Sequence, residues 1–89
     1  MYENIKKILE KAKETGKDIG VAYDMLSVTD KSEELKEASK FLNENQVEIL
    51  KLHNAGRDAE IKILCEYKDK PEKLRMYVAA LYSEGVIEK

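Results

Sequence analysis

Apolar side chains recur every three or four residues along nearly the whole chain, and this helical spacing constrains the fold more than any other feature. The first apolar face combines the residues Tyr2, Ile5, Ile8, Leu9 and Ala12. No stretch alternates apolar and polar residues long enough to predict a half-buried strand, and only Val86-Ile87 has the composition for a short one. The spacing therefore predicts an all-α fold, a compact bundle of five to six short helices.

Glycine and capping residues divide this pattern into separate helices. The pairs Asp30 with Glu33 and Asn45 with Glu48 have the capping-box arrangement ahead of the third and fourth helices. Gly56 is expected to end the fourth helix, as Gly16 ends the first, because glycine is the usual residue just past a helix end. The breaks therefore predict where each helix begins and ends.

The apolar positions also predict which side chains each later helix buries. The short second helix is expected to turn inward Ile19, Ala22, Met25 and Leu26. Asp58 is expected to cap a fifth helix, whose apolar face holds Ile61, Leu64 and Cys65. Pro71 suits the first turn of a sixth helix. The inner face of this sixth helix is predicted to consist of Leu74, Tyr77, Val78 and Leu81.

The charge and the cysteine count limit the possible partners and locations. A net charge of −2 argues against a protein that coats nucleic acid nonspecifically. The one compact basic stretch is KDKPEKLR (68–75), with four positive and two negative residues. Cys65 is the single cysteine, so no intramolecular disulfide forms and a reducing interior is expected. With no long apolar run, the sequence predicts no membrane association and a cytoplasmic location.

The second half of the chain runs ILKLHNAG, then RDAEIKILCEY, then KDKPEKLRMYVAALYSEGVIEK. Over about residues 47–89 it resembles the winged helix-turn-helix domains. Five residues of the last segment have that family's spacing, and they are Leu74, Val78, Leu81, Gly85 and Ile87. The turn before the last helix lacks the common glycine, and the sequence ends before a complete wing. The prediction is one domain over 1–89, with N-terminal helices in 1–44 and a helix-turn-helix-like unit in 45–89.

The resemblance implies that the last helix is a recognition helix, whose outer face enters the major groove of DNA. Arg75 would then contact a guanine edge, while Lys68, Lys70 and Lys73 would hold phosphates. On the same face, Met76, Ala79 and Ala80 form a smooth, weakly polar strip that suits close packing against a protein. The leading prediction is a small DNA-binding regulator, with a homodimer as one possible state.

The alternative prediction is a small protein–protein interaction module, such as an adaptor or an inhibitor of a host complex. A death-fold-like bundle of six helices would have the same helix count. Catalysis is not expected, because His53 and Cys65 are single residues without a partner for nucleophilic chemistry. A zinc site is not expected either, because one His and one Cys do not make a ligand set. The sequence predicts no cofactor.

Overall fold

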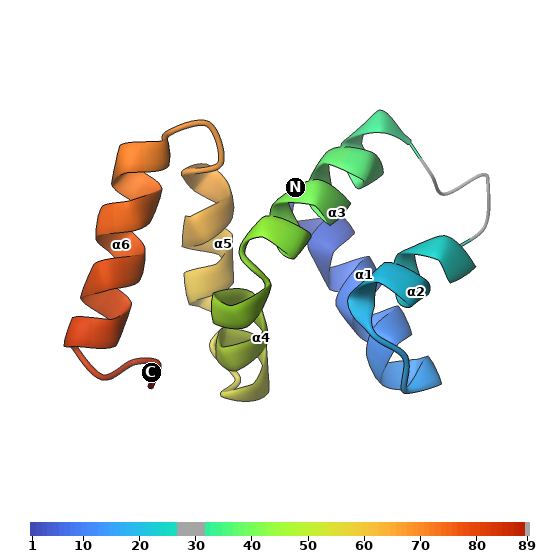
Figure 1. Ribbon diagram of the computed structural model, residues 1–89, viewed down its shortest axis with the longest axis horizontal. Coiled ribbons are helices and arrows are strands. Elements are labelled where there is room, and N and C mark those ends of the chain that lie inside the picture. Colours follow the sequence, from blue (N-terminus) through green and yellow to red (C-terminus); the bar gives the residue numbers. More distant parts are fainter. Residues whose placement is uncertain (27–31, 89) are drawn as a thin grey trace. The chain divides into compact units, whose positions relative to one another are not determined.

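Six α-helices make up most of the chain that the computed structural model describes, which comprises residues 1–26 and 32–88 (Figure 1). They are α1 (Tyr2–Thr15), α2 (Ile19–Met25), α3 (Glu33–Glu44), α4 (Gln46–Asn54), α5 (Asp58–Glu66) and α6 (Pro71–Ser83). The described residues form no strand, so the predicted all-α fold of short helices is confirmed. The chain divides into two compact units, Met1–Glu44 and Asn45–Lys89.

In the first unit, α1 packs against both α2 and α3. Its predicted apolar face is buried at Ile5, Ile8 and Leu9. The core residues that α3 adds are Leu35, Ala38, Phe41 and Leu42. Gly16 has a φ of 71° and its amide donates to the carbonyl of Ala12, so this glycine ends α1 as expected. The helical spacing thus identified most of this core.

The second helix corrects one prediction. Ile19 and Ala22 are buried, but Met25, which was expected to point inward, is 48% exposed. This seven-residue helix is capped by Asp18, whose carboxylate accepts a hydrogen bond of 2.9 Å from the Val21 amide. A helix this short buries a narrow stripe, and Met25 lies beside the stripe of Ile19 and Ala22 rather than on it.

The third helix begins with a cap that the sequence pattern did not identify. The Leu35 amide donates to the Ser32 hydroxyl over 3.1 Å, which places Ser32 in the capping role. Asp30, the residue expected to cap this helix, lies outside the described residues. The helix begins at Glu33, and Ser32 rather than Asp30 is the residue seen to satisfy its first turn.

In the second unit, the predicted caps of α4 and α5 are wrong. Asn45 precedes α4, but its side chain makes no capping hydrogen bond. Arg57, not Asp58, occupies the cap position of α5, and Asp58 is the first residue of that helix. The predicted stop at Gly56 is confirmed, with a φ of 73°. The Arg57 amide donates to the Leu52 carbonyl over 2.8 Å, which closes a Schellman motif at the end of α4.

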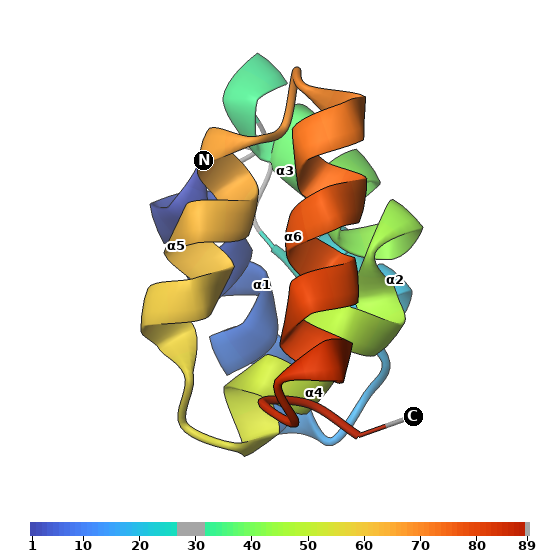
Figure 2. The same cartoon turned by 90° about the vertical axis from the view of Figure 1, so that its left-hand side faces the viewer.

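The helices α5 and α6 lie side by side and run in opposite directions (Figures 1 and 2). Residues 67–70 connect them, and Pro71 opens α6 as predicted. The rings of Tyr67 and Tyr77 meet edge to face, with centroids 5.9 Å apart. The pair is therefore an αα-hairpin with a four-residue connection.

The segment after α6 is a helix end and not a strand. Gly85 has a φ of 75°, and the Val86 amide donates to the Leu81 carbonyl over 2.9 Å in a second Schellman motif. Ile87 is 4% exposed, so its apolar side chain returns to the core as expected. The Lys51 ammonium of α4 contacts the Glu88 carbonyl and fixes this end. Residues 86–87, the one pair with the composition for a short strand, form none.

Candidate interaction surface

The predicted contact residues lie on one continuous stretch of the second unit. Lys68 and Lys70 belong to the connection before α6, and the others lie on α6 itself, namely Lys73, Arg75, Met76, Ala79 and Ala80. Lys68 and Ala80 are half-buried, and the remaining five residues are exposed. The weakly polar part of the predicted surface therefore lies on α6, and its basic part spans α6 and the connection before it.

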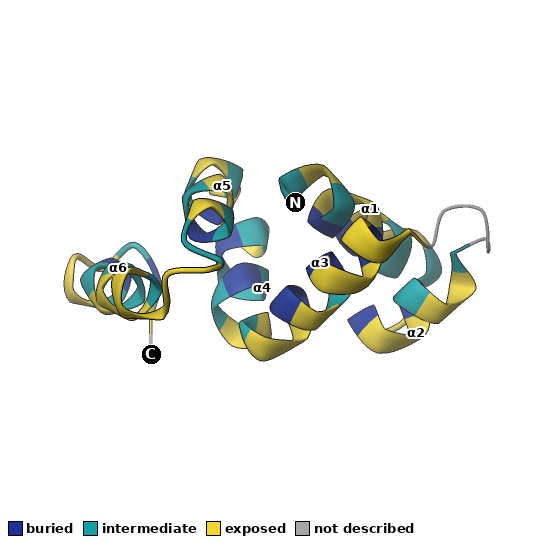
Figure 3. Cartoon of the chain, turned by 90° about the horizontal axis from the view of Figure 1, so that it is seen from above, coloured by how far each residue is buried: buried dark blue, intermediate teal, exposed yellow. Residues whose placement is uncertain are grey.

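The helix α6 buries far less apolar surface than its sequence provides (Figure 3). Leu81 is 3% exposed, but it is the one residue of this 13-residue helix that is buried. The other residues of the predicted inner face, Leu74, Tyr77 and Val78, are half-buried. Met76 is 72% exposed, which is the highest value among the exposed large hydrophobic residues in the described ranges. The surface that α6 exposes is called the α6 surface below. It consists of Leu74, Met76, Tyr77 and Val78 together with Lys73, Arg75, Ala79 and Ala80.

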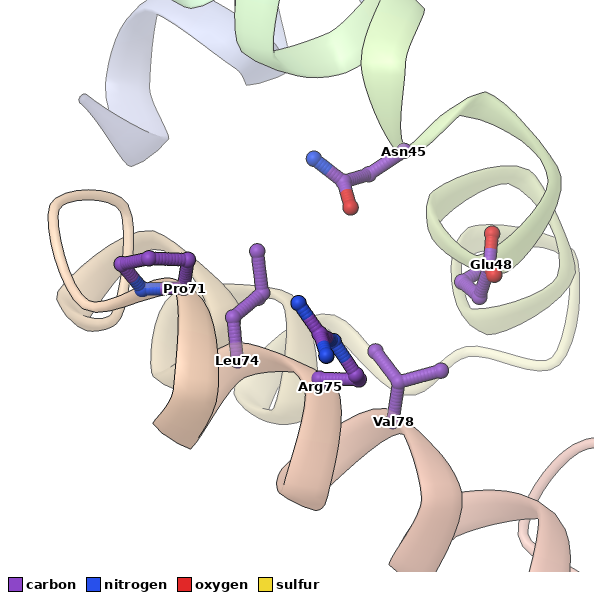
Figure 4. Close-up of a pocket in the computed structure, with 6 residues that line it drawn as sticks. All are labelled: Asn45, Glu48, Pro71, Leu74, Arg75 and Val78. Carbon is purple, nitrogen blue, oxygen red and sulfur yellow. The ribbon is translucent and has the colours of Figure 1, made fainter.

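On the flank of α6 that faces α4, the side chains border a shallow hollow of about 310 Å³ (Figure 4). Its lining residues, called the α4-side hollow below, are Asn45, Glu48, Pro71, Leu74, Arg75 and Val78. Asn45 and Glu48 form one wall, and the α6 residues form the facing wall. Arg75 and Glu48 form no ion pair or hydrogen bond with any other residue that the structure describes. The hollow thus combines apolar side chains with two charges that have no partner among the described residues.

A second hollow lies on the opposite flank, toward α5. It is lined by Tyr67, Lys73, Met76 and Tyr77. Burial, and after it the negative charge of Glu60, raises the pKa of the Tyr77 phenol above its ordinary value. Tyr77 is therefore neutral at physiological pH and offers an aromatic wall with a hydroxyl group. Together the two hollows leave the ridge of α6 raised between them.

The basic residues near the start of α6 do not form a uniform positive patch. Lys70, Lys73 and Arg75 are exposed and make no ion pair within residues 1–26 and 32–88. Asp69 and Glu72 are also exposed and lie between them in the sequence. A phosphate backbone near this stretch would meet carboxylates as well as cations.

His53 and Cys65, the two residues considered for catalysis, lie in surroundings that suit structural roles. His53 Nδ1 lies 3.2 Å from Asp58 Oδ1, and the histidine is half-buried between α4 and α5. Burial raises the pKa of the Cys65 thiol to about 11, so the thiolate is scarce at neutral pH. In the part of the chain that the structure describes, no three His, Cys, Asp or Glu side chains gather where they could hold a metal ion. None of the described helices has the length and apolar character needed to cross a bilayer.

The sequence analysis missed two residues of the α4-side hollow, Asn45 and Glu48, because it assigned them to a helix cap. Glu48 was expected to complete a capping box, and Asn45 to be its partner. With no capping bond at Asn45, both side chains face the α4-side hollow instead.

Comparison of the chain with protein-family models, with curated proteins and with solved structures finds no match.

Proposed function

We propose that the chain is a small helical module for protein–protein interaction, which binds a partner protein along the α6 surface. The observation that carries this proposal is the mismatch on α6 between apolar content and burial: one residue is buried, while Met76 is 72% exposed. Exposed apolar side chains that gather in one place on a soluble domain are typical of binding surfaces. Methionine is especially suited to such a surface because its flexible side chain adapts to different partners.

The arrangement of α5 and α6 also supports a protein partner over DNA. The two helices form an antiparallel hairpin (Figures 1 and 2), whereas the helices of a helix-turn-helix cross at about 90–120°. That crossing is what lets the second helix enter the major groove while the first spans the backbone. A hairpin instead presents the two helices as one broad face, with hollows along the flanks of α6.

DNA binding is the second candidate, and one observation favours it. Lys70, Lys73 and Arg75 are exposed and unpaired among the described residues, so they are free to contact phosphates. The interleaved Asp69 and Glu72 and the apolar exposure of Met76 place this candidate second.

The substitution Ala79→Lys separates the two candidates, since Ala79 is exposed in the middle of α6. An added lysine strengthens binding to DNA and obstructs close packing against a protein. The measurement is the recovery of bound proteins and of DNA fragments by tagged wild-type and Ala79→Lys chains, with and without nuclease. Lys7→Gln on α1 is the control. We expect a protein that the control retains and Ala79→Lys loses, in a nuclease-resistant manner. Salt-sensitive DNA recovery that Ala79→Lys preserves would contradict the proposal.

A further inference from the structure

The α4-side hollow carries, on its two facing walls, one charge of each sign that has no partner within residues 1–26 and 32–88. Arg75 lies on the α6 wall, and Glu48 lies on the α4 wall (Figure 4). Leu74 and Val78 are half-buried and supply the apolar part of the α6 wall. A protein that fits this hollow must therefore present an acid opposite Arg75, a base opposite Glu48, and apolar side chains between them.

The hollow itself has this composition, because it combines one base, one acid and two half-exposed apolar side chains. A two-fold interface joins the same patch on both copies and must therefore be complementary to itself, and a patch that carries both an acid and a base meets this requirement in charge. We infer that the partner at the α4-side hollow is a second copy of the chain, which forms a symmetric dimer. This inference rests on the proposed function and names the partner for one flank of the α6 surface.

Two-fold symmetry gives each charge a partner. In such an interface, when one residue contacts a second residue on the other copy, the reverse contact is also made. Arg75 of each copy then pairs with Glu48 of the other, which makes two ion pairs from one pair of residues. Leu74 and Val78, which lie beside Arg75 on the same wall, are covered by the other copy and lose their contact with water. The net charge of −2 on each chain opposes association only weakly at physiological ionic strength, and the two ion pairs offset this repulsion.

The dimer is tested first by the mass of the protein in solution. Sedimentation equilibrium over about 1 μM to 1 mM covers the weak affinities expected of a small interface. We expect the apparent mass of the wild type to rise from 10.2 kDa toward twice that value as the concentration increases. Arg75→Glu and Glu48→Arg should each raise the dissociation constant at least about tenfold, because each places two like charges opposite one another.

Mixing the two single variants gives the sharper test. A dimer of one Arg75→Glu chain with one Glu48→Arg chain has two pairs of opposite charge, one with the native signs and one with the signs reversed, although each variant alone repels itself. We expect the mixture to associate with an affinity within about threefold of the wild type. The matched control is a mixture of labelled Arg75→Glu with Glu10→Arg, whose added charge is on α1. It should recruit the labelled chain at least about tenfold less well. Circular dichroism checks that each variant is folded.

The outcomes distinguish this inference from the proposed function. A wild type that stays at 10.2 kDa up to about 1 mM overturns the inference. A dimer that neither single variant weakens, or two variants that fail to associate when mixed, overturns it as well. In each of these cases a protein that the wild type binds and Ala79→Lys loses would still support the proposed function. A dimer that follows the charge pattern supports both.

Discussion

His53 Nδ1 and Asp58 Oδ1 lie 3.2 Å apart and join the last turn of α4 to the first turn of α5. The two residues lie on either side of Gly56, whose φ of 73° reverses the chain. Asp58 was expected to cap its own helix, but its carboxylate turns back to the histidine of the preceding one. The link therefore holds the angle between two helices of the second unit.

This link predicts a measurable coupling. His53→Ala and Asp58→Ala should each lower the free energy of unfolding by about 0.5–1.5 kcal/mol, since each removes a partly exposed polar contact. The double variant should lose less than the sum, with a coupling of roughly 0.2–1 kcal/mol. Urea denaturation followed by circular dichroism measures all three values. Strict additivity would mean that the contact does not form in solution.

The backbone conformation of Gly85 predicts opposite effects for two glycine substitutions. Gly85 has a φ of 75°, so Gly85→Ala should cost roughly 1–2 kcal/mol through backbone strain alone, because a Cβ there meets no atom within 4 Å. Gly20 lies inside α2 with a helical backbone, and a Cβ there would lie 3.4 Å from Asp18 Oδ1, an ordinary contact. Gly20→Ala should therefore be neutral or stabilise by up to about 1 kcal/mol. Equal losses at both positions would contradict this account of the end of α6.

The burial along α6 predicts a large difference between two neighbouring positions. Leu81 is 3% exposed, so Leu81→Ala should lower the free energy of unfolding by about 2–5 kcal/mol. Ala79 is exposed, and Ala79→Ser should change it by no more than about 0.5 kcal/mol. Thermal or urea denaturation of the two variants gives the comparison. Similar losses would show that α6 presents a different face to its unit.

The raised pKa of Cys65 predicts slow thiol chemistry in the folded protein. Burial, with a smaller contribution from the charge of Glu66, raises this pKa to about 11. At pH 8 a thiol reagent should react at least about tenfold more slowly with the native chain than with the chain in urea. The native rate should keep rising up to about pH 11. A native rate that levels off near pH 8–9 would contradict the burial of the thiol.

The same shift fixes the sign of the pH dependence of stability. The folded chain holds the Cys65 proton more tightly than the unfolded chain does. The contribution of this thiol to stability is therefore intact below its ordinary pKa of 9.0 and is lost as the pH rises toward 11. Cys65→Ser should remove this part of the alkaline loss of stability.

Helical spacing predicted the core well where helices are long. Ile5, Ile8 and Leu9 of α1 are buried, because a helix of 14 residues gives the apolar stripe several turns in which to recur. The seven-residue α2 has too few turns for the spacing to show where its buried stripe ends. Met25 was therefore wrongly predicted to be buried. Glycine stops were predicted correctly at Gly16 and Gly56, because a positive φ is a local property of the chain.

The candidate surface was only partly predictable. The spacing identified the exposed side of α6, including Arg75 and Met76, because that side follows from the position of Leu81. It did not reveal that Leu74 and Val78 are only half-buried, since that depends on how closely α6 approaches its neighbours. It also missed Glu48, whose spacing matches a capping box that does not form. Such tertiary effects leave no periodic signal in the sequence.

Cross-linking from Met76 shows whether a protein partner covers the α6 surface. A photoreactive side chain is placed at Met76, which is 72% exposed, and separately at Lys17, which is exposed between α1 and α2. Both chains are irradiated in cell extract and at high concentration alone. We expect a discrete, nuclease-resistant protein adduct, with the partner or with a second copy, from position 76 and not from position 17. An adduct to DNA, or equal labelling from both positions, would contradict it.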